Sequence, residues 1–234
     1  MVVGSSRTEG LNAIVGGVQD WTKDYSALVA NVLLSQGIDT CVSACSGSDY
    51  LIAGDGGQVP AYYPNAAGQT ARWNVIDSGV SLLDSNSHIS AYGSTNTEPK
   101  AIALDLFSNG ATTGGDVTAM KAAMVACMKA LRGAAPNAWI FIIVPSGFYY
   151  VPTYPAEYLT ALNDAFSSYQ SANPSDGRVQ LIDIGHDLSM RITSAVDLYV
   201  NEDHVHPLEA GHALIAPVIM SGIQGALSSP TYQF

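Results

Sequence analysis

A carboxylate and a histidine stand close together near the end of this 234-residue chain, in Asp203-His204-Val205-His206-Pro207. On one short turn, Asp203 can accept a hydrogen bond from the imidazole of His206. The ring is then held in one tautomer, and its other nitrogen can take up a proton. Such a pair is typical of general-base chemistry, which requires a nucleophile.

The opposite end of the chain offers that nucleophile. Met1–Gly4 is a short apolar run, and Ser5 and Ser6 follow it in a turn. A hydroxyl at the carboxyl end of a parallel strand lies where α/β sheets place their active sites. We therefore expect Ser6 to meet His206, which would assemble a serine hydrolase from the two ends of the chain.

The elements that must position these residues alternate between strands and helices. The expected strands are Met1–Gly4, Thr40–Ala44, Ala101–Phe107, Ala138–Pro145 and Val179–Asp183. The third and fourth of these are almost continuously apolar, as is typical of strands buried on both faces. Apolar residues spaced three and four apart predict helices over 21–33, 119–131 and 158–169, ending before Gly37 and Gly133 in the first two cases. A last helix is expected to begin at Pro207 and run towards Leu227.

This order predicts an α/β protein with a single domain over residues 1–234. Five parallel strands joined by right-handed crossovers would form a three-layer α/β/α sandwich. Ser6, Gly47, Asn109 and the Tyr149–Tyr150 loop all follow expected strands, so they should gather at one edge of the sheet.

Composition excludes several classes of protein. The net charge of −11, with nine Lys and Arg residues, argues against nucleic acid as a partner. No apolar run approaches the roughly 18 residues of a membrane helix. The first residues lack the basic and apolar regions of a signal peptide, so the sequence does not identify the cellular compartment. An acidic, lysine-poor chain is typical of an extracellular or saline setting.

Cys41, Cys45 and Cys127 are expected to be buried thiols.

Four sequence blocks, in order along nearly the whole chain, resemble those of the SGNH, or GDSL-type, serine esterases. The first is Gly4-Ser5-Ser6, and the second is the glycine Gly47. The third is Phe107-Ser108-Asn109-Gly110, and the fourth is Asp203, His206 and Pro207, which Gly211-His212 extends. Ser5, Phe107 and Gly110 depart from the family pattern, which has Asp, Gly and Asp there.

The resemblance implies a flavodoxin-like topology and a role for each matching residue. Ser6 would attack an ester carbonyl, His206 would act as the base, and Asp203 would orient His206. The oxyanion would be held by the backbone amides of Ser6 and Gly47 and by the side-chain amide of Asn109. No metal or organic cofactor is implied.

Two other features have alternative interpretations. Glu202, Asp203, His204, His206 and His212 could suggest a metal site, but no second ligand cluster accompanies them. Tyr149 and Tyr150, with Tyr62 and Tyr63 from a Gly-rich loop, either cap the core or form a substrate wall for sugar or aryl rings.

The sequence therefore predicts hydrolysis of a carboxylic ester through an acyl-serine intermediate. Polar, Tyr-rich loops and the lack of a long apolar lid favour short acyl groups, particularly acetyl groups on carbohydrate. The alternatives are a non-catalytic carbohydrate-binding module on the same scaffold, an aryl- or alkyl-esterase, or a thioesterase.

Overall fold

The computed structural model describes residues 1–11, 13–44, 46–51, 75–76, 80–81, 99–106, 109, 116–144, 156–184 and 206–228. All structural statements below concern these residues.

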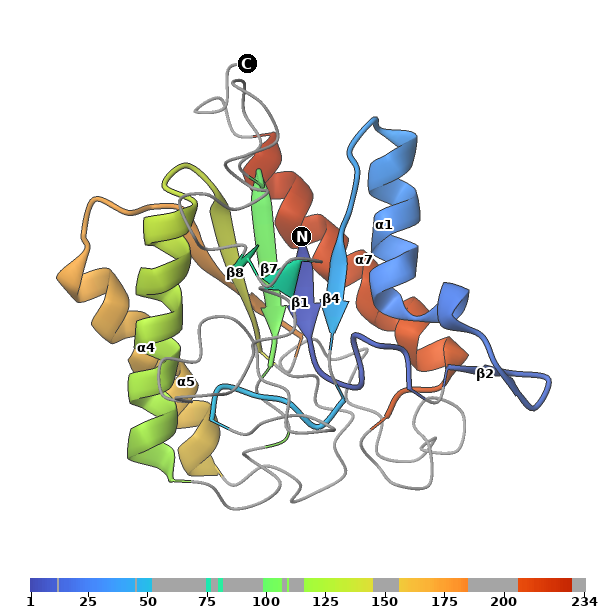
Figure 1. Ribbon diagram of the computed structural model, residues 1–234, viewed down its shortest axis with the longest axis horizontal. Helices are drawn as coiled ribbons and strands as arrows, with labels where there is room; N and C mark the ends of the chain where they lie inside the picture. Colours follow the sequence, from blue (N-terminus) through green and yellow to red (C-terminus); the bar gives the residue numbers. More distant parts are fainter. Residues whose placement is uncertain are drawn as a thin grey trace.

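The centre of the fold is a parallel sheet of five strands (Figure 1). They are β1 (Val2–Gly4), β4 (Val42–Ala44), β7 (Ala101–Asp105), β8 (Trp139–Val144) and β9 (Val179–Asp183). Their order is β4-β1-β7-β8-β9, and every neighbouring pair is parallel. The expected five-stranded parallel sheet and flavodoxin-like order are confirmed. The direction of winding reverses at β1, and the crevice at such a switch point is where α/β proteins place ligands.

Four of the strands are shorter than their expected ranges by one or two residues at an end. The edge strand β4 shows the reason, because among the described strands it pairs with β1 alone and can begin only where β1 offers a partner residue. The first rung joins Val2 to Val42, so Thr40 and Cys41 precede the sheet. A strand's length is set by its partner as well as by its own apolar run.

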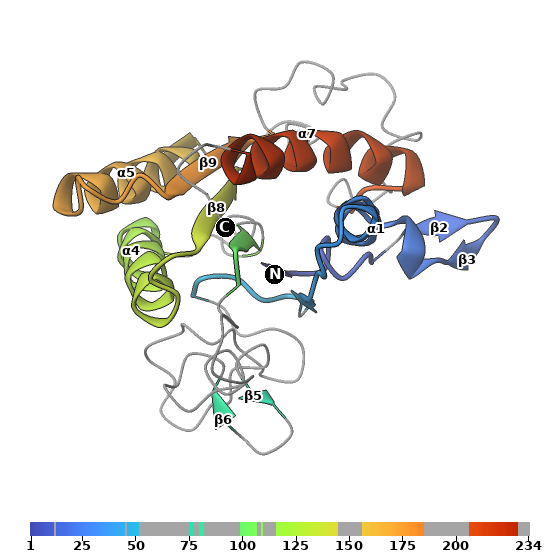
Figure 2. The same ribbon diagram turned by 90° about the horizontal axis from the view of Figure 1, so that it is seen from above.

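Helices cover both faces of the sheet, as Figure 2 shows from above. α4 (Val117–Ala134) and α5 (Ala156–Ala172) lie on one side, and α1 (Tyr25–Ser35) and α7 (Glu209–Leu227) lie on the other. Alternate residues of each strand enter the two cores. Ile140 and Ile142 of β8 face α4 and α5, whereas Phe141 and Ile143 face α1 and α7. The three-layer α/β/α sandwich is therefore confirmed.

Three helix limits differ from expectation. Trp21 lies in a separate 3-10 turn, η1 (Trp21–Lys23), because Asp24 caps α1 by accepting a 2.8 Å hydrogen bond from the amide of Ala27. Gly133 lies inside α4, which ends only as the chain approaches Pro136. α7 begins at Glu209 rather than Pro207, because Leu208 is extended with ψ 174°.

Sequence analysis missed the short antiparallel hairpin of β2 (Ile14–Val15) and β3 (Val18–Gln19). Its turn is Gly16-Gly17, and both residues have positive φ. A Gly-Gly pair between apolar residues is a known hairpin signal, so this element was predictable. A second short hairpin pairs β5 (Val75–Ile76) with β6 (Val80–Ser81).

The cysteines are not all buried as expected. Cys127 is buried in α4, and burial raises the pKa of its thiol. Cys41 is exposed, because it precedes β4, which is the edge strand of the sheet in the part of the chain that the structure describes. Cys45 lies outside the described residues.

Helix α7 is the one described helix long and apolar enough, by length and composition, to cross a membrane. Within the fold its apolar face packs on the sheet and on α1, with Ile215, Ile219 and Ile223 fully buried. Its place in the core accounts for its hydrophobicity.

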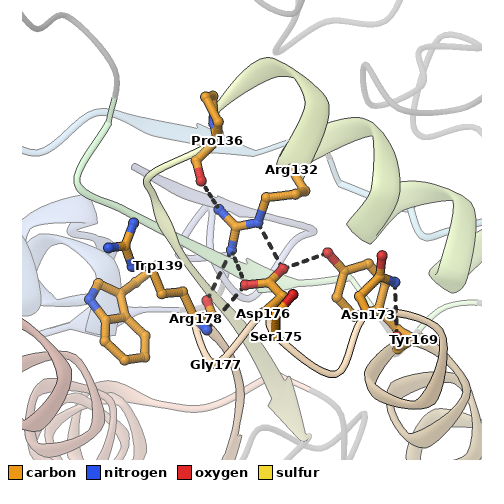
Figure 3. Close-up of a pocket in the computed structure, with 9 residues that line it drawn as sticks. All are labelled: Arg132, Pro136, Trp139, Tyr169, Asn173, Ser175, Asp176, Gly177 and Arg178. Atoms are coloured by element: carbon orange, nitrogen blue, oxygen red, sulfur yellow. Dashed lines mark hydrogen bonds and ion pairs between the residues drawn. The ribbon is translucent and has the colours of Figure 1, made fainter. Parts of the chain in front are cut away.

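A cavity of about 530 Å³ is lined by residues around the starts of β8 and β9, among them Trp139 and Arg178 (Figure 3). Arg132 of α4 fills its polar side and donates from Nε and Nη2 to both oxygens of Asp176, at 2.8 and 3.0 Å. Its Nη1 donates to the carbonyls of Ala135 and Ala138. Burial opposes ionisation of Asp176, but bonds from Arg132 and Tyr169 outweigh it and hold the pKa of the carboxyl below its ordinary value. The guanidinium therefore joins the end of α4 to the starts of β8 and β9.

Replacing Arg132 should destabilise the fold. We expect Arg132→Met to lower the free energy of unfolding by about 2–3 kcal/mol, because Asp176 would lose its charge-assisted hydrogen bonds. Urea unfolding measures this, with Lys129→Met, at an exposed cation of the same helix, as the matched control. Equal midpoints for the two variants would contradict this role.

Candidate active site

Ser6 lies in a tight helical turn directly after β1. The amide of Glu9 donates to the carbonyl of Ser5 and that of Leu11 donates to the carbonyl of Ser6, each at 2.9 Å. Gly4 allows this close return, because a Cβ there would lie 1.8 Å from Oγ1 of Thr8. The turn leaves Ser6 largely buried at the carboxyl end of a central strand.

His206 reaches Ser6 from the far end of the chain. Its Nε2 lies 2.7 Å from Oγ of Ser6, a hydrogen bond that spans 200 residues. The imidazole is half-buried and the following residue, Pro207, is buried. The structure thus brings together the hydroxyl and the imidazole that the sequence singles out, in the arrangement by which a base activates a nucleophile.

The loop after β4, which carries Gly47, contacts the side chain of Asn109. Nδ2 of Asn109 donates a 2.9 Å hydrogen bond to the carbonyl of Ser48, the residue after Gly47. Gly47 has a φ of +77°, a left-handed conformation that glycine adopts without the cost paid by other residues. The bond to Ser48 uses one of the two amide hydrogens of Asn109 and fixes the plane of the group.

A buried ion pair lies beneath the Ser6 turn. Nη2 of Arg7 donates to Oδ1 of Asp105, the last residue of β7, and both side chains are almost inaccessible to solvent. Tyr25 of α1 donates to the other carboxylate oxygen at 2.9 Å and also contacts the hydroxyl of Thr8. Burial, and next the Asp105 carboxylate, raise the pKa of Tyr25 well above its ordinary value. The network joins the Ser6 turn to β7 and α1.

His212, one turn into α7, is a buried histidine with a different partner. Its Nδ1 accepts a 3.2 Å hydrogen bond from the first amide of α1, that of Tyr25, and the two rings stack with centroids 6.0 Å apart. Burial, and then the charges of Arg7 and His206, lower the pKa of His212 to about 3. The ring is therefore neutral, with its proton on Nε2, and it joins α7 to α1 beside the Ser6–His206 pair.

Five of the expected site residues lie outside the described residues. They are Asp203, the partner expected for His206, and the aromatic residues Tyr62, Tyr63, Tyr149 and Tyr150.

Sequence reasoning missed the Arg7–Asp105 pair. Its signal was a single carboxylate, Asp105, within the apolar run Ala101–Phe107. A charge at the end of a fully buried strand requires a partner, and Arg7 directly follows the serine of interest.

The fold is that of the SGNH-type hydrolases. It is similar to a family two carbohydrate esterase from Clostridium thermocellum in complex with cellohexaose, with a TM-score of 0.66 at 16% identity over 97% of this chain and 63% of that one. It is also similar to a carbohydrate esterase family 2 enzyme plus carbohydrate binding domain from Corynascus thermopiles, with a TM-score of 0.62 at 21% identity over 97% of this chain and 66% of that one.

TesA has the same fold, with a TM-score of 0.59 at 16% identity over 96% of this chain and 97% of that one. This chain thus spans less than two thirds of the Clostridium structure and nearly all of TesA. No protein-family model matches the chain, and no curated protein sequence matches it.

The neutral state of His212 predicts a loss of stability in acid. The unfolded histidine takes up a proton below its ordinary pKa of 6.5, whereas the folded one does so only near pH 3. The free energy of unfolding should therefore fall as the pH drops from about 6.5 towards 3, and His212 should contribute up to about 1.4 kcal/mol per pH unit.

His212→Asn, which keeps an acceptor close to the position of Nδ1, should remove that contribution and flatten the slope. Urea unfolding of both proteins between pH 6.5 and 4 measures the two slopes, and the carboxylates common to both cancel in the comparison. Parallel slopes would show that His212 takes up no proton on unfolding.

Proposed function

We propose that this chain is a serine esterase that hydrolyses carboxylic esters through an acyl-serine intermediate. The observation that carries the proposal is the 2.7 Å hydrogen bond between Oγ of Ser6 and Nε2 of His206 at the switch point of the sheet. A serine hydroxyl is a poor nucleophile near pH 7, so a base within hydrogen-bond distance is the requirement that this geometry meets.

The chemistry assigned to these residues has two halves. In the first, Oγ of Ser6 bonds to the ester carbonyl carbon while Nε2 of His206 takes the hydroxyl proton. His206 then gives this proton to the departing alcohol as the carbon–oxygen bond breaks. In the second half, water attacks the acyl-serine, and His206 relays the proton of that water to Oγ. Asp203 is proposed to accept from Nδ1 and to stabilise the imidazolium.

Oxyanion stabilisation is assigned to the amides of Ser6 and Gly47 and to Nδ2 of Asn109. The hydrogen bond from Asn109 to Ser48 supports this assignment, because it holds the side chain against the Gly47 loop before any substrate binds. Donors fixed in advance stabilise developing charge without reorganising during the reaction.

Acetyl and other short acyl esters, including acetyl groups on carbohydrate, are the proposed substrates. Solved structures that share this fold include carbohydrate esterases, one of them in complex with cellohexaose. Tyr62, Tyr63, Tyr149 and Tyr150 are proposed to contact the substrate.

Loss of the Ser6 hydroxyl should abolish turnover. We expect Ser6→Ala to lower kcat on p-nitrophenyl acetate by at least ~10³-fold, because no acyl-serine can form. Ser5→Ala is the matched control, since the Ser5 hydroxyl is buried and has no hydrogen-bond partner among the described residues. Similar kcat values for the two variants would overturn the assignment of the nucleophile.

Asn109 should act on the transition state rather than on binding. We expect Asn109→Ala to lower kcat about 10²–10³-fold with little change in KM. The isosteric variant Asn109→Asp should lose at least as much, because it replaces the donors with a negative acceptor. A rise in KM at constant kcat would make Asn109 a binding residue instead.

The length of the acyl pocket can be measured directly. We expect kcat/KM for p-nitrophenyl esters to be highest at acetyl and to fall towards dodecanoyl, and sugar acetates to be hydrolysed. A steady rise with chain length would instead indicate an extended acyl pocket and a long-chain esterase or thioesterase.

A further inference from the structure

Glu9 connects the turn that carries Ser6 to the loop that carries Gly47. Its carboxylate oxygen Oε2 accepts a 2.8 Å hydrogen bond from the backbone amide of Ser46. The backbone of Glu9 belongs to the Ser6 turn, because its own amide donates to the carbonyl of Ser5. A single residue therefore contacts both segments that are assigned oxyanion amides.

Among the described residues, the Ser46 amide is the partner that accounts for the position of the Glu9 carboxylate. Its side chain is half-buried, and among the described residues it forms no ion pair with a lysine or arginine. A half-buried charge that accepts from a backbone amide forms a charge-assisted hydrogen bond, stronger than one between neutral groups. Its effect is to fix the peptide plane that enters the Gly47 loop.

Only the φ and ψ angles of Ser46 separate that peptide plane from the peptide that carries the Gly47 amide, so its position limits where the Gly47 amide can lie. Ser46 immediately precedes Gly47, which has a left-handed backbone conformation. On the other side of Gly47, the carbonyl of Ser48 accepts from Asn109. The loop of Ser46, Gly47 and Ser48 is thus held at Ser46 by Glu9, from the Ser6 turn, and at Ser48 by Asn109.

We propose that Glu9 is a positioning residue that sets the distance between the Ser6 nucleophile and the Gly47 amide through its hydrogen bond to Ser46. The proposal rests on the esterase function proposed above. Amide donors act on the oxyanion only within a narrow range of distance, so a loop displaced by about 1 Å costs rate. Substrate binding depends little on this loop position, because the charge develops only in the transition state.

The experiment compares Glu9→Ala, Glu9→Gln and Glu9→Asp on p-nitrophenyl acetate, with Glu157→Ala, at an exposed glutamate of α5, as the control. Glu9→Ala should lower kcat about 10–100-fold with KM within about twofold. Glu9→Gln keeps an oxygen at the same reach and should recover most of the loss. Glu9→Asp keeps the charge but is one methylene shorter, and should resemble Glu9→Ala.

A double-mutant cycle with Asn109→Ala tests whether the two residues act through one loop. The combined loss in kcat should be smaller than the product of the single losses, because either change releases the same segment. If Glu9→Ala does not fold, the comparison of Glu9→Gln with Glu9→Asp decides the matter alone.

The possible failures are distinguishable. Absence of turnover in the unchanged protein would overturn the proposed function itself. Normal turnover by the unchanged protein and by Glu9→Ala, or equal activity of Glu9→Gln and Glu9→Asp, would overturn the role of Glu9 and leave the function standing. A change confined to KM would make Glu9 a substrate contact.

Discussion

The hydrogen bond between Ser6 and His206 joins residues that are 200 positions apart, and the fold must position both to a fraction of an ångström. β1 fixes Ser6, because it lies between β4 and β7 and is held on both sides. α7 fixes His206, because this helix begins three residues after His206 and packs on the sheet and on α1. The bond from the Tyr25 amide to His212 adds a link between α1 and α7 beside the pair. The chemistry proposed for this site thus depends on the packing of one face of the sheet.

Buried charge beneath the site gives the Ser6 turn a second restraint. Arg7 directly follows Ser6, and its pair with Asp105 joins the turn to the end of β7. Breaking such a pair is costly, because the remaining charge stays buried without compensation; losses of about 3–5 kcal/mol are usual. The same guanidinium helps to keep His212 neutral. The two histidines therefore differ in role: His206 contacts the Ser6 hydroxyl, whereas His212 is buried and bonded to the amide of Tyr25.

Much of the fold could be predicted because the strands are buried on both faces. Ala101–Asp105 and Trp139–Val144 are nearly uniform apolar runs, and the alternation of strands with helices leaves few topologies. Helix limits were harder, because they depend on capping by Asp24 and on the extended backbone at Leu208. The contact between Ser6 and His206 could be predicted from motif order and sheet topology.

The residues that support the site could not be predicted in the same way. Glu9 and Ser46 lie 37 positions apart. Neither the residue types nor the spacing predicts that the Glu9 carboxylate accepts a hydrogen bond from the Ser46 amide. Tyr25 and His212 are separated by 187 residues, and their bond depends on how two helices pack. Such contacts follow from tertiary structure, so a local pattern does not encode them.

The most direct test of the account is the covalent labelling of the unchanged protein with a fluorophosphonate, followed by mass spectrometric mapping of the modified residue. The reagent reacts with a serine only where a base activates it and donors stabilise the adduct. The account predicts one equivalent of label on Ser6, and loss of labelling in His206→Gln. An unlabelled protein, or label on a serine other than Ser6, would contradict it.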